Sequence, residues 1–315
     1  MISVKKICSG DKPALARAIS LIENDSNKES KLLCSLYPYL GKAHRIGITG
    51  PPGVGKSTLV DELTRAIRAN HKKVGVIAID PTSIFSGGAI LGDRIRMHKV
   101  GLDAGVFIRS MATRGCAGGI SRATSEVADL IDASGKDYVI IETVGVGQSE
   151  VEIFKNVDTT ILVLSPESGD AIQAMKAGIM EIANLIVINK SDRAGADALL
   201  DAIRNAQQIA KETRNKINKP AAIFKIEAIN SIGVKEVVEY LDSRWAELKS
   251  SGELDAKRRL IMKERLKSLF INRIEEKIWQ NKGVEPLINK SIDKILAGKD
   301  NPYHAVDRII RSVLK

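Results

Sequence analysis

Residues 47–58 read GITGPPGVGKST and contain the pattern G-x-x-x-x-G-K-[S/T] between a short apolar run and a helical pattern. Glycines at these places let backbone N–H groups turn toward phosphate oxygens, and the start of the helix adds partial positive charge. The lysine would reach the β- and γ-phosphates, and the serine hydroxyl would ligate Mg²⁺. The stretch therefore predicts a phosphate-binding loop in an α/β fold. The loop residues that we expect to bind a nucleotide are Gly50, Gly53, Val54, Gly55, Lys56, Ser57 and Thr58.

Seven short apolar runs follow one another along the middle of the chain, and helical patterns separate them. The runs are RIGIT, KVGVIAID, AGVFIRS, DYVIIET, DTTILVLS, NLIVINK and AAIFKIEA. Such runs are typical of buried parallel strands. Helical spacing extends from Lys56 to Ala69, from Ser121 to Ala133 and from Asp170 to Ile182. The alternation predicts an α/β fold of the P-loop NTPase type, with a mostly parallel, doubly wound central sheet.

Both ends of the chain have helical patterns without strands. Residues 11–40 place apolar side chains at helical spacing around a polar interruption, which predicts a helical hairpin. Beyond about residue 233 the pattern is wholly helical, with a charged segment from Leu254 to Gln280 and a last helix signalled by NPYHAV. We therefore divide the chain into an N-terminal helical extension (1–43), a P-loop domain (44–245) and a C-terminal helical region (246–315).

The composition of the chain limits its partners. Among 315 residues there are 48 Lys and Arg against 38 Asp and Glu, a net charge of +10, which permits an anionic partner without choosing one. Aromatic residues make up only 4%, so little stacking surface exists for single-stranded nucleic acid, and we do not expect that partner. Three separated cysteines indicate neither a disulfide framework nor a zinc site. No run approaches the ~20 apolar residues of a membrane span, so we expect a cytoplasmic protein.

Two predicted strands end in a carboxylate, and a third carboxylate lies further along the chain. Glu142 follows YVII and is the first candidate for Mg²⁺, and the N–H of Gly145 in the same E-x-x-G could contact the γ-phosphate. Asp80 and Asp93 are further candidates to hold the metal or a water molecule. We expect a metal site of Ser57, Asp80, Asp93 and Glu142, and catalysis of hydrolysis by Lys56, Asp80, Asp93 and Glu142. Which aspartate orients the attacking water stays open.

A second motif, NKSD at 189–192, follows the run LIVI and predicts which base is bound. Asp192 can accept hydrogen bonds from both N1–H and the 2-amino group of guanine, which adenine cannot donate. Asn189 would support the loop, and the stem of Lys190 would pack on the base. We therefore expect GTP and GDP, rather than ATP, as the bound nucleotides. Near Glu227 and Ala228 a further loop offers backbone contacts to the base.

The stretches GPPGVGKST, DPTSIFSGGAILGDRIRM, FIRSMATRGCAGGI, IIETVGVGQSE and NKSD, in this order, resemble the MeaB family, also called the ArgK or methylmalonic aciduria type A family. SGDKPALARAISLIE and AGKDNPYHAVDRII extend the similarity to nearly the whole chain. The resemblance implies a SIMIBI-class GTPase. It also implies a chaperone that gates adenosylcobalamin loading and protection of an acyl-CoA mutase, typically methylmalonyl-CoA mutase, and a homodimer formed through the C-terminal helices. Because no arginine finger is identifiable, we expect slow turnover without a partner.

The stretch from Pro166 to Lys176 corresponds to an additional switch of that family, which communicates with the mutase. Lys176 matches a lysine there, whereas Glu167 and Ala171 stand where the family usually has a glycine and an acidic residue. Whether this switch is still coupled to a mutase is open.

Two other functions remain as alternatives. A nickel-inserting GTPase of the same class would bring Cys and His ligands, but the four histidines, His44, His71, His98 and His304, are not clustered. A kinase that acts on a transport-binding protein would transfer phosphate to a protein rather than to water, and only an assay separates it from a GTPase.

Overall fold

The structure is a computed structural model, and it describes residues 3–24, 26–80, 98–112, 122–143, 157–167, 180, 182–213, 219–281 and 283–313. The chain forms two compact units, Met1–Leu254 and Asp255–Lys315. The first unit contains a β-sheet and the helices that cover it, and the second contains helices alone. The three-part division expected from the sequence stays a prediction.

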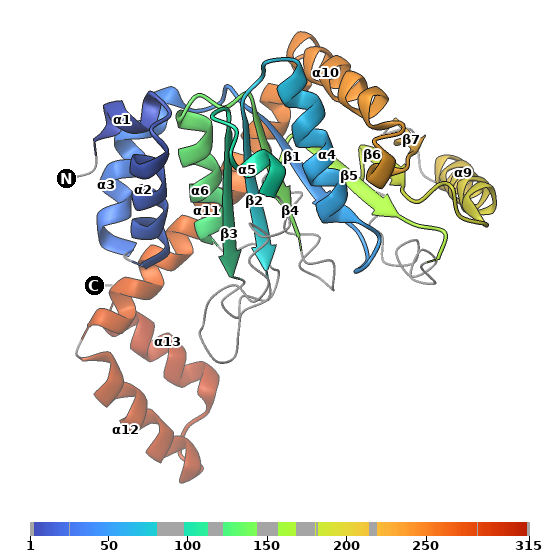
Figure 1. The fold of residues 1–315 in the computed structure, drawn as a ribbon. Helices are drawn as coiled ribbons and strands as arrows, with labels where there is room; N and C mark the ends of the chain where they lie inside the picture. Colours follow the sequence, from blue (N-terminus) through green and yellow to red (C-terminus); the bar gives the residue numbers. More distant parts are fainter. Residues whose placement is uncertain are drawn as a thin grey trace. The chain divides into compact units, whose positions relative to one another are not determined.

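The centre of the first unit is a sheet of seven parallel strands in the order β3-β2-β4-β1-β5-β6-β7 (Figure 1). The strands are β1 (His44–Thr49), β2 (Val74–Asp80), β3 (Val106–Ala112), β4 (Tyr138–Glu142), β5 (Thr159–Leu164), β6 (Leu185–Ile188) and β7 (Ala222–Lys225). Each of the seven apolar runs overlaps one of them, although β1 begins one residue before its run and β3 extends two residues beyond its run. The α/β fold with a parallel, doubly wound sheet, predicted from these runs, is therefore confirmed.

Helices cover both faces of the sheet, because its strands are apolar on both sides. Val74 and Val76 of β2 join one core cluster, and Ile77 and Ile79 of the same strand join the opposite one. The first face is covered by α4 (Lys56–Ala69), α5 (His98–Gly101) and α10 (Val234–Ser250). The second face is covered by α1 (Val4–Cys8), α2 (Lys12–Asn24), α3 (Ser26–Leu36), α6 (Arg122–Ala133) and α9 (Ala196–Thr213).

The predicted helices have mixed outcomes. The helix from Lys56 to Ala69 is α4 with the predicted bounds, and the one expected from Ser121 is α6, which begins at Arg122. The hairpin is α2 and α3, and the short helix α1 before it was not predicted. The helix expected from Asp170 to Ile182 lies almost wholly outside the described residues.

The N-terminal helices are fixed to the sheet through the segment that precedes β1. Asp132 at the end of α6 accepts hydrogen bonds from the backbone N–H groups of Gly41, Lys42 and Ala43, at 2.9, 3.1 and 3.0 Å. The same carboxylate accepts a bond of 2.8 Å from Arg45 Nη2, which also donates to Asp129. Because the Asp132 side chain is fully buried, these bonds replace the water that the carboxylate loses on folding.

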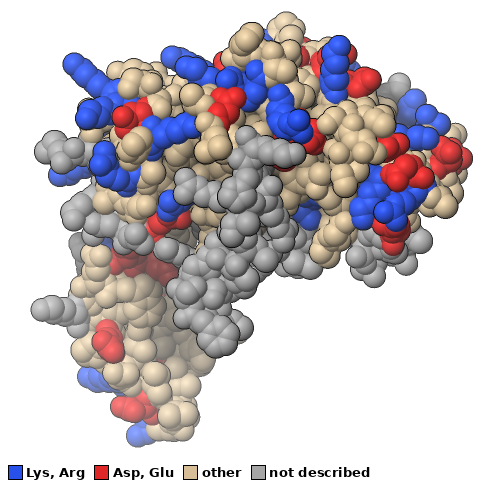
Figure 2. All heavy atoms as spheres, in the orientation of Figure 1, with Lys and Arg blue, Asp and Glu red and all other residues tan. Residues whose placement is uncertain are grey.

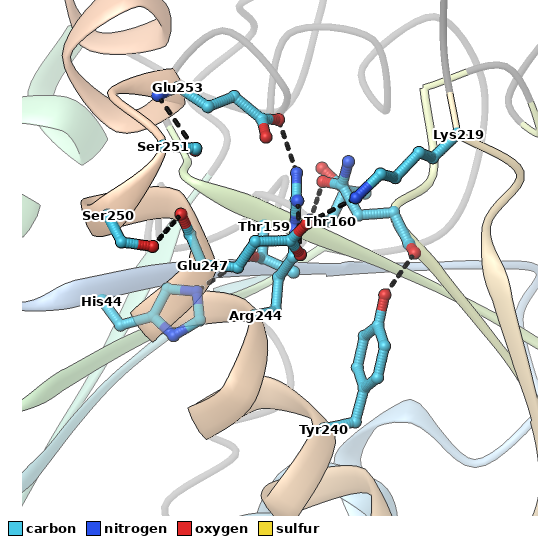
Figure 3. A network of polar contacts seen from close by, with 11 residues as sticks. His44, Thr159, Thr160, Lys219, Tyr240, Arg244, Glu247, Ser250, Ser251 and Glu253 are labelled. Carbon is cyan, nitrogen blue, oxygen red and sulfur yellow. Dashed lines mark hydrogen bonds and ion pairs between the residues drawn. The ribbon is translucent and has the colours of Figure 1, made fainter.

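At the amino ends of β1 and β5, a network of polar contacts (Figure 3) and one ring contact attach α10 to the sheet. His44 Nε2 lies 2.7 Å from Thr159 Oγ1, and the His44 ring stacks on Trp245 of α10 with 4.6 Å between the ring centroids. Arg244 donates to Glu247 and to Glu253, which joins α10 to the start of the next helix. These contacts fix the end of α10 that is remote from the phosphate loop.

The second unit consists of α11 (Glu253–Gln280), most of which lies in it, with α12 (Val284–Leu296) and α13 (Pro302–Val313). The charged segment from Leu254 is α11, and α13 begins at the proline of NPYHAV. Asn301 caps α13 by accepting the N–H of His304 at 3.0 Å, and Pro302 is its first residue, where a missing N–H costs nothing.

Candidate nucleotide-binding site

The phosphate loop connects β1 to α4 at the carboxyl edge of the sheet (Figure 1). Gly50 and Gly55 have φ angles of 144° and 94°, which favour glycine. A Cβ on Gly50 would lie 2.1 Å from the carbonyl oxygen of Val163, and one on Gly55 would lie 2.4 Å from Asn189 Nδ2. The two glycines therefore allow the loop to approach the end of β5 and the residues that follow β6.

Lys56 and its neighbours occupy the first turn of α4. The Lys56 side chain is buried inside the loop, where Nζ donates to the carbonyl oxygens of Gly50 and Pro51 at 2.8 and 2.9 Å. Val54 is fully buried, whereas Gly53 and Thr58 are exposed. A phosphate held by this loop would meet the ammonium charge together with the amino end of the helix.

Ser57 and Glu142 meet where α4 begins and β4 ends. The Ser57 hydroxyl donates to Glu142 Oε1 at 2.7 Å, and Glu142 is 5% exposed. Mg²⁺ prefers such hard oxygen ligands and usually takes only one or two from the protein. The two oxygen atoms of Ser57 and Glu142 fit Mg²⁺ as ligands, and the ion would be held beside the phosphate loop.

The other acidic candidates are placed only in part. Asp80 is the last residue of β2, which neighbours β4 in the sheet, and Ala78 is in register with Glu142. The Asp80 side chain, Asp93 and Gly145 lie outside the described residues, so their roles stay predictions.

Asn189 joins three loops through one side-chain amide. Its Nδ2 donates to the carbonyl oxygen of Val54 at 2.9 Å, and its Oδ1 accepts the backbone N–H of Ala228 at 3.0 Å. Asn189 is 3% exposed. Because a buried amide with fixed partners has little freedom, it sets the distance between the phosphate loop, the NKSD loop and the loop after β7.

The charged residues of the NKSD loop form a small network with the segment after β5. Glu167 accepts hydrogen bonds from Lys190 Nζ at 3.0 Å and from Arg193 Nη1 at 2.6 Å. Arg193 Nε also lies 3.6 Å from Asp192 Oδ2. The hydrogen bond from Lys190 and the positive charge of Arg193 hold the pKa of Glu167 below its usual range. The carboxylate of Glu167 therefore remains ionised at neutral pH.

This network was only partly foreseen from the sequence. The sequence indicates Glu167 only as a departure from a family pattern, and no motif points to Arg193. The contact depends on the sheet order: Leu164 of β5 and Ile188 of β6 are neighbours in register, which brings the residues just beyond them close together.

Glu227 and Ala228 form the loop after β7. Glu227 is joined to Ile232 by an antiparallel bridge, and its side chain accepts the amide of Asn230 at 3.1 Å. The N–H of Ala228 is bonded to Asn189, so this loop contributes first to the position of the NKSD loop.

A parallel sheet with a phosphate loop after β1 and an N-K-x-D tetrad after β6 defines a P-loop GTPase. The chain belongs to the MeaB family: the family model described as methylmalonyl-CoA mutase-associated GTPase MeaB matches residues 15–283.

Similar proteins cover almost all of the chain. A protein of Pyrococcus horikoshii that is named as a GTPase is 43% identical over 312 residues, which are 99% of this chain and 97% of that protein. A mouse protein named methylmalonic aciduria type A homolog, mitochondrial, is 32% identical over 329 residues, covering 97% of this chain and 77% of the mouse protein. The crystal structure of a LAO/AO transport system kinase superposes with a TM-score of 0.71 at 26% identity, covering 99% of this chain and 96% of that one.

Among the helices that the structure describes, none has the length and apolar character needed to cross a membrane.

Proposed function

We propose that this protein is a GTP-binding and GTP-hydrolysing chaperone that gates adenosylcobalamin loading and protection of an acyl-CoA mutase, with methylmalonyl-CoA mutase as the first candidate. The observation that carries this proposal is the match of residues 15–283 to the family of mutase-associated GTPases. Relatives named methylmalonic aciduria type A homolog in mouse and Caenorhabditis elegans support it.

The phosphates of the nucleotide and the Mg²⁺ ion would be bound by neighbouring groups of residues. The phosphate loop from Gly50 to Thr58 would hold the phosphates, with Lys56 neutralising their charge. Ser57 and Glu142 would hold Mg²⁺, assisted by Asp80 and Asp93, and the bound ion would supply further positive charge to the phosphate oxygens. The 2.7 Å contact between Ser57 and Glu142 supports this assignment, since it brings two oxygen donors to one point.

Base selection would depend on the NKSD loop. Asp192 would accept the two N–H groups of guanine, while the stem of Lys190 covers the base. The structure supports this assignment through Asn189, whose amide holds the tetrad against the phosphate loop. Replacing Asp192 by Asn should weaken the preference for GTP over xanthosine triphosphate, and an unaltered preference would count against the assignment.

Hydrolysis requires an oriented water beside the bound phosphates, and Asp80 or Asp93 would supply that orientation. We expect slow turnover until a partner orders the site. The first test is GTP turnover by the purified protein, alone and with an adenosylcobalamin-dependent mutase. Stimulation by the mutase is the expected result, and the Lys56→Ala variant should show no turnover. If the protein hydrolyses GTP but neither binds the mutase nor is stimulated by it, the GTPase activity would stand and the proposed chaperone function would be refuted.

A homodimer in the cytoplasm is the proposed form of the protein. Large apolar side chains of the second unit are exposed, including Leu260, Phe270 and Trp279 of α11 at 67%, 68% and 63%. Such exposed side chains could be buried against a second copy of the chain, which supports the proposed dimer.

A kinase function is the second candidate, because the superposed crystal structure carries that name. Incubation with labelled GTP or ATP and candidate transport-binding proteins separates the two. Label on a protein would support the kinase, and free phosphate alone would remove it.

A further inference from the structure

We infer that Glu167 is a positioning residue for guanine selection: its carboxylate holds Arg193 away from Asp192 and so keeps Asp192 available to the base. The inference rests on the proposed guanine-nucleotide site at residues 189–192. It adds a residue and a role that the family motifs do not contain.

The geometry shows one arginine shared between two carboxylates. Arg193 Nη1 lies 2.6 Å from Glu167 Oε1, whereas Arg193 Nε lies 3.6 Å from Asp192 Oδ2. The first distance is that of a charge-assisted hydrogen bond, and the second is too long for one. In this arrangement Glu167 has the closer contact with Arg193, and Asp192 keeps its acceptor atoms.

Glu167 also holds a second cation of the same loop. Its other oxygen, Oε2, accepts from Lys190 Nζ at 3.0 Å. Lys190 has a positive φ of 57°, so the backbone turns sharply at this residue, between Asn189 and the residues that follow. The single carboxylate thus restrains the side chains of Lys190 and Arg193, which flank Ser191 and Asp192, from the segment that follows the neighbouring strand β5.

The chemistry of the base explains why this matters. Guanine offers N1–H and a 2-amino group, and recognition needs both oxygens of Asp192. A guanidinium that pairs fully with Asp192 would present two N–H groups to the same oxygens and compete with guanine. Xanthine carries an oxygen at position 2, which repels a carboxylate but accepts from an arginine. Loss of Glu167 should therefore weaken guanine binding and reduce discrimination against xanthine.

The experiment compares Glu167→Gln, Arg193→Gln and the double variant by calorimetric titration with Mg²⁺–GDP and Mg²⁺–XDP. We expect Glu167→Gln to bind GDP about two- to fivefold more weakly, as befits exposed ion pairs, with a lower ratio of GDP to XDP affinity. In the Arg193→Gln background, the same Glu167 change should have little effect, because the competing guanidinium is gone.

The matched control is Glu264→Gln, since Glu264 is another exposed glutamate in an ion pair, 2.7 Å from Lys267 on α11. It should bind GDP like the unchanged protein, and thermal unfolding verifies that every variant is folded. GDP binding unaffected by Glu167→Gln overturns the inference, as does an equal loss with and without Arg193. If the unchanged protein binds no GDP, the proposed guanine-nucleotide site is refuted as well. Failure of the Glu167 inference alone is thereby distinguished from failure of the proposed site.

Discussion

Asn189 joins two neighbouring loops through one buried side chain, and in the proposed function it also supports base recognition. Replacement by Ala leaves two buried backbone groups without their partner, the carbonyl of Val54 and the N–H of Ala228. We predict a loss of about 1–3 kcal/mol in the free energy of unfolding, together with weaker GDP binding. Urea unfolding without nucleotide measures the first effect, and nucleotide titration measures the second.

The matched control for this change is Asn230→Ala. Asn230 also donates a side-chain amide hydrogen bond, to Glu227 at 3.1 Å, but it does so on the surface. It should change stability by no more than about 0.5 kcal/mol. Equal losses from both variants would mean that the buried bridge adds nothing beyond an ordinary amide contact.

Lys136 is a buried cation in a basic neighbourhood at the amino edge of the sheet, where Lys and Arg side chains are frequent in the view of Figure 2. Burial, together with the positive charges of Lys12, Lys73 and Arg68, lowers its pKa to about 8, against a smaller opposing effect of Asp103. Its Nζ donates to the carbonyl oxygen of Gly105 at 3.2 Å, which also accepts the N–H of Val74.

The lowered pKa predicts a pH-dependent stability. Between pH 8 and the usual lysine pKa of about 10.4, the unfolded chain binds more protons at Lys136 than the folded one, so this residue makes stability rise with pH. We predict that Lys136→Met is more stable than the unchanged protein at pH 7 and that the difference shrinks toward pH 10. Thermal unfolding across this range measures it. A difference that is constant with pH would contradict the prediction.

At the scale of elements, Asp132 connects α6 to the segment that leads into β1. Its replacement by Ala removes the acceptor of three backbone N–H groups and one of the two carboxylates that Arg45 contacts. We predict a loss of about 3 kcal/mol or more, measured by denaturant unfolding. Asp129→Ala is the comparison, because it removes the other carboxylate of Arg45 without these backbone bonds. A larger loss for Asp129 would mean that the ion pair, and not the backbone segment, is decisive.

Elements were predictable where local pattern and burial agree. Strands buried on both faces must be apolar throughout, so all seven could be found from runs such as Leu185–Ile188. The short helices α1 and α5 could not, because five and four residues show too little periodicity. The position of the phosphate loop could likewise be predicted from its motif. The partner of Arg193 could not, since it depends on which loops the sheet order brings together.

At the scale of the whole molecule, the two units differ in how they bury apolar surface. The first unit has core clusters on both faces of its sheet. In the described part of residues 255–315, the buried apolar side chains are Val284 and Ala305. A helical unit with so few buried side chains needs additional apolar contacts to be stable, and the proposed self-association would supply them.

The proposed homodimer predicts the effect of a charge on α11. Phe270 is 68% exposed, and Phe270→Lys should weaken self-association about tenfold or more, because it places an ammonium in the apolar contact. Sedimentation equilibrium over a range of protein concentrations measures the dissociation constant. The control is Ile209→Lys on α9, an apolar residue that is 63% exposed in the first unit, which should leave association unchanged. A monomeric unchanged protein would overturn the proposed homodimer. Equal effects of the two substitutions would place its interface elsewhere than on α11, since only a contact that includes Phe270 makes the two lysines unequal.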